Sequence, residues 1–99
     1  MKIELTGHTA LVTASTAGIG LAIAQGLANA GARIILNGRS TDSVERARQR
    51  LLAAVPGADV LGVAADLSDA AGVDTLLAGL PKVDILVNNA CLLYTSDAA

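Results

Sequence analysis

Short apolar runs alternate with helix-like segments along almost the whole chain, and this alternation limits the fold more than any other sequence feature. Runs rich in strand-forming residues occupy positions 9–13, 32–37, 59–64 and 83–87. Helix-like segments between them occupy positions 18–30, 41–55 and 70–80. Strands separated by helices of this length are joined by right-handed crossovers. The sequence therefore predicts an α/β fold with a doubly wound parallel sheet.

The composition supports this prediction and excludes nucleic-acid binding. Hydrophobic residues make up 53% of the 99 residues, with ten Gly, no Phe, no Trp and a single Tyr. A core of small and branched aliphatic residues suits helices that pack closely on a parallel sheet. The net charge is −2, and the local group Arg46, Arg48 and Arg50 falls mostly on the outer face of a predicted helix. A duplex-binding protein would instead present a basic face.

Three absences in the sequence favour a cytoplasmic location. No apolar run approaches the roughly 20 residues that cross a bilayer. The first five residues, MKIEL, lack the apolar core of a secretion signal. A single Cys forms no internal disulfide, and nothing suggests export. We therefore expect a cytoplasmic protein with no membrane partner.

The segment TASTAGIG, residues 13–20, joins the first strand to the first helix. Gly18 and Gly20 fall where the helix begins, and the free N–H groups of a helix N-terminus attract phosphate. Without Cβ atoms, these glycines allow a pyrophosphate to approach and the helix to lie close to the sheet. Ser15 and Thr16 can add hydroxyl donors to phosphate or ribose. The alternative is a tight turn of small residues without a ligand; neither G-x-G-x-x-G nor a P-loop is present.

A second signal follows the second strand, in the segment NGRS at residues 37–40. Dinucleotide-binding folds that prefer NAD place a carboxylate here to bind the ribose 2′-hydroxyl. This chain has no acid there and offers Arg39, whose guanidinium suits the additional phosphate of NADP. The alternative is a surface arginine in a turn. The sequence predicts that NADP(H) is preferred over NAD(H).

Taken in order, TASTAGIG, NGRS, AADLSD and VDILVNNA resemble the motifs of the short-chain dehydrogenase/reductase family over residues 5–90. The resemblance implies a Rossmann-type doubly wound parallel sheet, truncated here after its fourth strand. It also implies an oxidoreductase that moves a hydride between NAD(P)H and a carbonyl compound or secondary alcohol. Many relatives with these motifs are 3-oxoacyl-(acyl-carrier-protein) reductases, which makes that activity the most specific expectation.

The family's cofactor pattern, Thr-Gly-x-x-x-Gly-x-Gly, matches here except that Ala14 replaces the first Gly. If φ at this position is positive, the methyl group costs about 1 kcal/mol or more. By the same resemblance Asp66 and Leu67 flank the adenine, although Asp66 could equally cap a helix, and the backbone of Asn88 lies beside the cofactor ribose. The complete expected cofactor set is Thr13, Ala14, Ser15, Thr16, Gly18, Ile19, Gly20, Arg39, Ser40, Asp66, Leu67, Asn88 and Ala90.

The family's catalytic Ser and Tyr-x-x-x-Lys pair do not occur in these residues, since Tyr94 is followed four positions later by Ala98. The segment CLLYTSDAA at 91–99 matches the translation of a transposon-derived sequencing adapter, the alternative being a divergent natural terminus. We expect residues 1–90 to be the N-terminal part of an NAD(P)-binding Rossmann domain, residues 91–99 to be a non-native tail, and the chain alone to be inactive. The full-length protein is expected to be a homo-oligomer acting on a small carbonyl compound or alcohol.

Three alternatives remain to the oxidoreductase interpretation. A methyltransferase on a similar fold would keep an acid after the second strand, where this chain has Gly38 and Arg39. A sensor that binds a dinucleotide without catalysis would lack the Tyr-x-x-x-Lys pair in its remaining sequence. The third alternative is that the 99 residues as written have no activity.

Overall fold

The computed structural model describes residues 3–89, and it contains each strand and helix expected from the sequence. The elements are β1 (Thr9–Val12), α1 (Gly18–Asn29), β2 (Arg33–Gly38), α2 (Thr41–Ala54), β3 (Val60–Ala64), α3 (Ala70–Ala78) and β4 (Ile85–Val87). Their ends differ from the expected ones by one or two residues. The suggested boundary at residue 90 and the tail at 91–99 lie outside the described residues.

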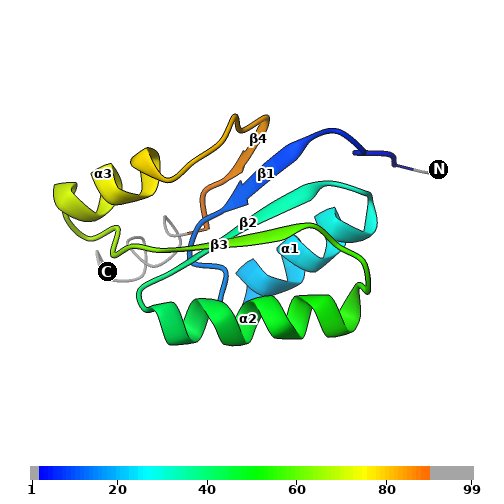
Figure 1. Ribbon diagram of the computed structural model, residues 1–99, viewed down its shortest axis with the longest axis horizontal. Helices are drawn as coiled ribbons and strands as arrows, with labels where there is room; N and C mark the ends of the chain where they lie inside the picture. The colour runs from blue at the N-terminus through cyan, green and yellow to red at the C-terminus, as the bar shows by residue number, and fades with distance from the viewer. Residues whose placement is uncertain (1–2, 90–99) are drawn as a thin grey trace, which may run out of the picture.

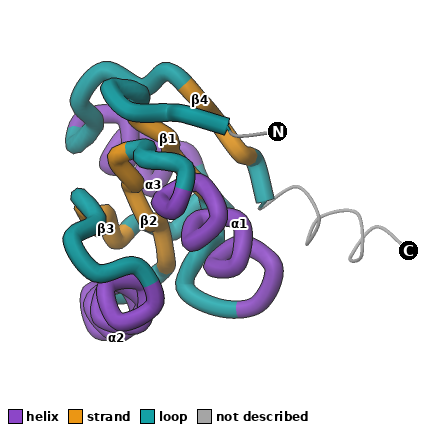
Figure 2. The backbone as a smooth tube through the Cα atoms, turned by 90° about the vertical axis from the view of Figure 1, so that its right-hand side faces the viewer, coloured by secondary structure: helices purple, strands orange, loops and turns teal. Residues whose placement is uncertain are grey.

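The strands form one sheet in the order β3-β2-β1-β4, and every neighbouring pair is parallel (Figure 1). Figure 2 shows the strands following one another in this order, with α1 to their right. The chain moves outward from β1 to β3 and then returns to place β4 on the other side of β1. In a sheet of this kind, ligands bind outside the carboxyl ends of the strands where the strand order reverses. The predicted doubly wound parallel sheet is confirmed.

Two apolar clusters cover the two faces of the sheet. Helices α1 and α2 pack on one face, where their side chains meet those of Val12, Ile34 and Leu36. Helix α3 contributes Leu76 to the opposite face, against Leu11. Because the side chains of a strand alternate between faces, neighbouring residues of one apolar run serve different clusters.

Helix α2 shows how the sequence sets the packing. Its buried residues Val44, Ala47 and Leu51 recur at helical spacing. Ser40 caps its start, because the Ser40 hydroxyl accepts a hydrogen bond of 3.1 Å from the backbone N–H of Ser43. The opposite side of the helix carries exposed arginines, which confirms a solvated face there.

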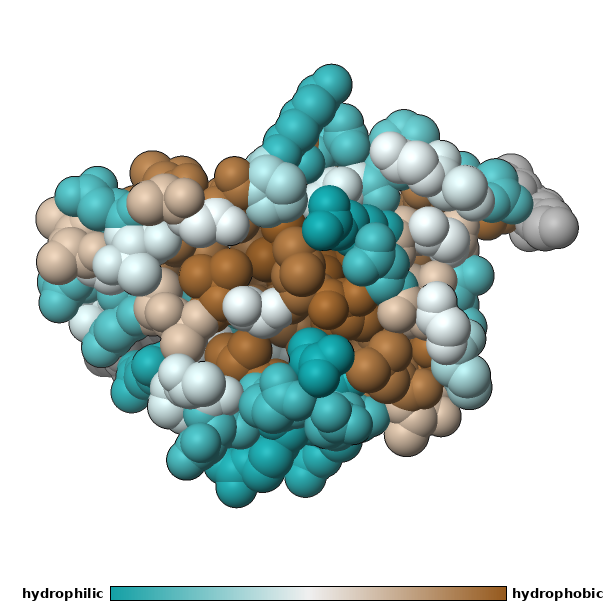
Figure 3. Space-filling model, viewed as in Figure 1, coloured by the Kyte–Doolittle hydropathy of each residue, from teal (hydrophilic) through white to brown (hydrophobic). Residues whose placement is uncertain are grey.

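The face covered by α3 keeps apolar side chains at the surface. Leu61, Ile35, Leu11 and Leu86 form a row across the four strands, each in register with its neighbour. The two ends of the row, Leu61 and Leu86, are 37% and 63% exposed. Figure 3 shows apolar side chains gathered across the middle of the molecule on this side.

Candidate functional site

The carboxyl ends of the parallel strands bring the predicted site segments to one edge of the sheet. The turn before α1 follows β1, Arg39 and Ser40 follow β2, Asp66 follows β3, and Asn88 follows β4. Backbone hydrogen bonds link these ends, with Thr13 N–H bonded to the Val87 carbonyl and Ala65 N–H bonded to the Gly38 carbonyl. The segments singled out in the sequence therefore share one continuous edge.

Helix α1 begins at this edge without a capping side chain. Ala17 occupies the N-cap position and makes no side-chain cap hydrogen bond, and the first turn contains no acidic residue. The first N–H groups of a helix have no partner within the helix, so an uncapped start offers donors and partial positive charge to an anion. Ile19 lies in this first turn and is 65% exposed.

The two glycines of this turn serve different purposes. Gly18 has φ of +58°, and a Cβ added there would meet no atom within 4 Å, so its role is conformational and the space above it is open. Gly20 is buried, and a Cβ there would lie 2.5 Å from the Ala14 carbonyl oxygen and 2.7 Å from Asn89 Nδ2. Gly20 is therefore required for close packing of α1 against the turn.

Ala14 adopts the left-handed conformation, with φ of +50°. This is the conformation for which the sequence predicted a cost of about 1 kcal/mol relative to glycine. Two asparagines hold its peptide groups: the Ala14 N–H donates to Asn37 Oδ1 at 3.1 Å, and Asn89 Nδ2 donates to the Ala14 carbonyl at 3.0 Å.

The Ser15 hydroxyl, which the sequence suggested as a donor to phosphate or ribose, bonds the Asn37 backbone in the structure. Ser15 is fully buried, its hydroxyl accepts a hydrogen bond from the Asn37 N–H at 2.9 Å, and it donates to the Asn37 carbonyl at 3.4 Å. Thr13 is also buried and donates from its hydroxyl to the Val87 carbonyl at 3.3 Å and to Asn88 Oδ1 at 3.4 Å. The hydroxyls of Ser15 and Thr13 thus join neighbouring strand ends.

The end of β2 presents a cation beside small residues. Arg39 and Ser40 are exposed, and Arg39 takes part in neither of the two ion pairs found among residues 3–89. Gly38 is buried, and a Cβ added to it would overlap the Thr16 methyl carbon. The Thr16 side chain thus occupies the space into which a side chain at position 38 would extend.

Asp66 is an exposed carboxylate at the end of β3. The backbone N–H of Ser68, 2.9 Å from Asp66 Oδ1, lowers the pKa of this carboxyl most, followed by the Ser68 hydroxyl and, more weakly, by the charge of Arg39. Asp66 does not cap α3. The cap is Asp69, whose Oδ1 accepts a hydrogen bond of 2.7 Å from the Gly72 N–H. Asp66 therefore keeps acceptor capacity for a ligand.

A family model described as short chain dehydrogenase matches residues 8–99. The chain belongs to the short-chain dehydrogenase family. An uncharacterized oxidoreductase of Bacillus subtilis is 46% identical over 89 residues, which cover 90% of this chain and 34% of that protein. A D-beta-hydroxybutyrate dehydrogenase of Cupriavidus necator is 43% identical over 96 residues, covering 93% and 36%. The chain spans about a third of the length of these curated relatives.

Solved short-chain dehydrogenase structures have the same fold. The L-sorbose reductase of Gluconobacter frateurii, complexed with NADPH and L-sorbose, matches 90% of this chain and 35% of its own, with a TM-score of 0.80 and 40% identity. A 3-oxoacyl-(acyl-carrier-protein) reductase from Agrobacterium tumefaciens with NADP bound matches 87% and 34%, with a TM-score of 0.72 and 46% identity. The family and the Rossmann-type fold expected from the motifs are both confirmed.

In this short-chain dehydrogenase, sequence reasoning missed residues that hold the site edge together. Asn37 and Asn89 fix the Ala14 peptide groups from two sides. Gly72 packs against the backbone of Asp66, where an added Cβ would overlap the carbonyl oxygen. Asn37 gave one usable signal, since it is a polar residue that ends the apolar run ARIILN. Asn89 lies in the motif VDILVNNA, directly after an apolar run, whereas the contact of Gly72 leaves no local signal.

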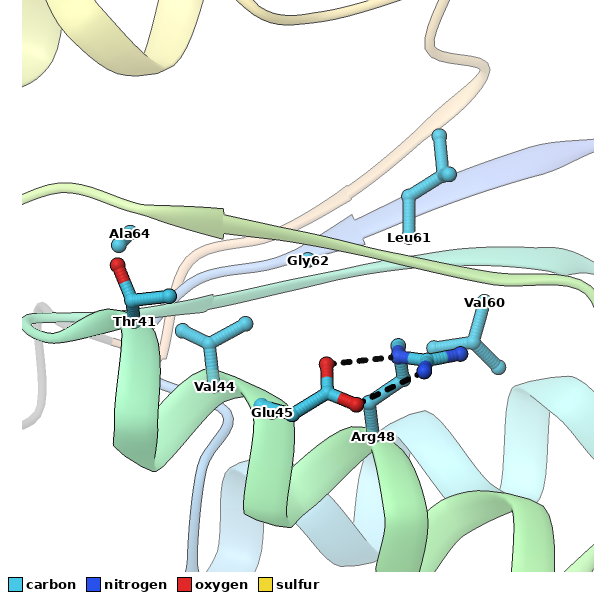
Figure 4. A pocket seen from close by; sticks show the side chains of 8 residues that line it. All are labelled: Thr41, Val44, Glu45, Arg48, Val60, Leu61, Gly62 and Ala64. Carbon is cyan, nitrogen blue, oxygen red and sulfur yellow. Dashed lines mark hydrogen bonds and ion pairs between the residues drawn. The ribbon is translucent and has the colours of Figure 1, made fainter.

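A separate hollow lies at the outer edge of β3, between that strand and α2 (Figure 4). Its polar groups already bond one another: Arg48 Nε and Nη2 donate to the Glu45 carboxylate at 3.0 and 2.8 Å. These hydrogen bonds, with one from Gln49, lower the pKa of Glu45 to about 2. The hollow lies beside β3, the strand farthest from β4, and does not include the start of α1.

Two further observations concern the described part of the chain alone. Among residues 3–89, no group of three or more His, Cys, Asp and Glu side chains is placed to hold a metal ion. No helix within the same residues is long and apolar enough to cross a membrane. Ala90, expected beside the cofactor ribose, lies outside the described residues.

Proposed function

We propose that this chain is the cofactor-binding part of an NADP(H)-dependent short-chain oxidoreductase. The observation that carries the proposal is the uncapped start of α1 at the same sheet edge as Arg39 and Asp66. A dinucleotide needs donors for its pyrophosphate, a partner for its adenosine ribose and an acceptor for its adenine. The three features supply these in one place, at the point where the strand order reverses.

The start of α1 fits a pyrophosphate. Its N–H groups lack a side-chain cap, and the open space above Gly18 admits an anion close to the backbone. The half-buried Thr16 supplies a hydroxyl at the same turn. We assign the pyrophosphate to this turn, with the apolar side chain of Ile19 packing against the cofactor.

The end of β2 fits the additional phosphate that distinguishes NADP from NAD. Arg39 offers charge-assisted hydrogen bonds, and the neighbouring Ser40 offers a hydroxyl. The overlap between Thr16 and any side chain at position 38 disfavours the carboxylate that an NAD-preferring site requires there. The Gluconobacter and Agrobacterium structures hold NADPH and NADP, which supports this preference.

The remaining assignments concern the adenine and the second ribose. The exposed Asp66 carboxylate, whose pKa is lowered mainly by the hydrogen bond from the Ser68 N–H, can accept a hydrogen bond from the adenine amino group. Leu67 lies beside it on the same loop and is half-buried. Asn88 and Ala90 follow β4, and we assign their backbone to the cofactor ribose.

Short-chain dehydrogenases are oxidoreductases that act on alcohols and carbonyl groups. The bound nicotinamide supplies the hydride for this chemistry. The residues described here bind and orient that cofactor, and none of them is assigned a proton-transfer role. We propose a small carbonyl compound or secondary alcohol as the substrate of the whole protein, and no activity for the 99 residues alone.

The experiment that tests this function uses the protein encoded by the complete gene. We expect it to oxidise NADPH in the presence of at least one member of a panel of 3-oxoacyl thioesters, ketoses and simple ketones. NADH should support a slower rate at equal concentration. The 99-residue chain, assayed in parallel, should give no turnover. Failure to bind NADPH or NADH at all would refute the proposal.

The contact between Gly38 and Thr16 gives a testable consequence for cofactor affinity. We expect Gly38→Ala to weaken NADPH binding about threefold to tenfold, because the new methyl group displaces Thr16 from the cofactor turn. The double variant Gly38→Ala with Thr16→Ser removes the Thr16 methyl carbon and keeps its hydroxyl, so affinity should recover. Equal affinities of the two variants would show that the overlap has no effect.

A further inference from the structure

Asn37 is a buried polar residue at the carboxyl end of β2 and is 2% exposed. Its carboxamide is bonded on every side. Oδ1 accepts from the Ala14 N–H at 3.1 Å, and Nδ2 donates to the carbonyls of Val63 and Ala65 at 3.2 and 3.3 Å. Both amide hydrogens are therefore used, so the orientation of the carboxamide is fixed.

The backbone of Asn37 makes two further hydrogen bonds to the same turn. Its N–H donates to Ser15 Oγ at 2.9 Å, and its carbonyl accepts from the Ser15 N–H at 2.8 Å. Asn37 thus bonds Ala14 and Ser15 on one side, and the carboxyl end of β3 on the other. The loops that follow β1 and β3 are the ones to which the pyrophosphate and the adenine are assigned.

Ala14 is the part of this network that needs support. A non-glycine residue with positive φ persists only where its surroundings hold it there. If the Ala14 N–H lost its acceptor, the residue would be free to relax to negative φ. The peptide that follows Ala14 would then rotate. This rotation would change the direction of the backbone that leads to Gly18.

We propose that Asn37 is a positioning residue for the cofactor: it holds the loops after β1 and β3 in the binding arrangement before the cofactor arrives. This inference rests on the proposed dinucleotide-binding function. Asn37 itself is buried beneath the turn and acts through Ala14 and the β3 end. When the loops are already ordered, binding has a smaller entropic cost, which increases affinity.

The test separates positioning from a general contribution to stability. In the protein encoded by the complete gene, Asn37→Ala should weaken NADPH binding by about tenfold or more, measured by nicotinamide fluorescence. The matched control is Val60→Ala, which removes buried apolar volume at the other end of β3 and should lower the melting temperature while changing the dissociation constant less than about twofold.

A second substitution tests the route through Ala14. Glycine adopts positive φ without strain, so Ala14→Gly should recover at least about threefold of the affinity that Asn37→Ala loses. A general loss of stability would not be reversed in this way. Affinity unchanged by Asn37→Ala, or a loss that Ala14→Gly leaves entirely in place, would overturn the proposal.

Hydrogen exchange on the unmodified protein keeps the proposal falsifiable if Asn37→Ala does not fold. Without cofactor, the Ala14 amide should exchange slowly, because it already bonds Asn37, while the Ile19 amide should exchange fast and become protected when NADPH is added. An Ala14 amide that exchanges as fast as that of Ile19 before NADPH is added would contradict the inference. Failure of the unmodified protein to bind NADPH or NADH would instead refute the proposed function, so the two failures are distinct.

Discussion

Replacing Gly20 with alanine should lower the free energy of unfolding by about 3 kcal/mol and weaken NADPH binding by about a hundredfold or more. The new Cβ would lie 2.5 Å from the Ala14 carbonyl oxygen and 2.7 Å from Asn89 Nδ2. The first of these atoms belongs to the backbone, so the clash cannot be relieved by a side-chain rotation. Either α1 moves away from the sheet or the turn shifts, and both changes displace the N–H groups assigned to the pyrophosphate.

The same helix offers a matched control for this substitution. Gly26 also lies in α1, but a Cβ added there would meet no atom within 4 Å. Gly26→Ala should therefore raise the free energy of unfolding by about 0.5–1 kcal/mol, the usual gain from replacing a helical glycine. Both variants are measured by denaturant unfolding and by NADPH titration. If Gly20→Ala behaved like Gly26→Ala, the close packing of the turn on α1 would be wrong.

Replacing Arg39 with alanine should reduce NADPH affinity by about tenfold to a hundredfold and leave NADH affinity within about twofold. A hydrogen bond to a charged group contributes about 1.5–3 kcal/mol, and only NADPH carries the phosphate that Arg39 would bind. Arg39 is exposed and belongs to neither ion pair of residues 3–89, so its loss should not affect folding.

Arg46 is a suitable control for the loss of positive charge. It is exposed on α2 and outside the segments assigned to the cofactor. Arg46→Ala changes the net charge as Arg39→Ala does, and it should leave the NADPH to NADH affinity ratio unchanged. A ratio that falls equally in both variants would indicate a general electrostatic effect in place of a phosphate contact at Arg39.

The fold could be predicted from local information because each element carries its own signals. Val44, Ala47 and Leu51 at helical spacing, Ser40 at the start of α2 and the apolar run of β2 all act within a few residues. Parallel pairing and strand order then follow from crossover rules that hold for most α/β proteins. The grouping of the site segments could also be predicted, since parallel strands place their carboxyl ends at one edge of the sheet.

The interior of the site could not be predicted in the same way. Asn37 meets Ala14 across 23 residues and Ala65 across 28, and nothing in the local sequence pairs these positions. Ser15 carries a hydroxyl that suits phosphate, but the packing of β1 beside β2 turns it inward to the Asn37 backbone. The sign of φ at Ala14, which decides whether its methyl group is strained, also depends on these distant contacts.

Direct titration of the protein encoded by the complete gene with NADPH and with NADH tests the central claim of a cofactor site that prefers NADP(H). Isothermal calorimetry gives both affinities and the stoichiometry without requiring a substrate. We predict one saturable site per chain and an NADPH dissociation constant lower than that of NADH by about tenfold or more. Equal or tighter binding of NADH, or no saturable binding of either nucleotide, would contradict this claim.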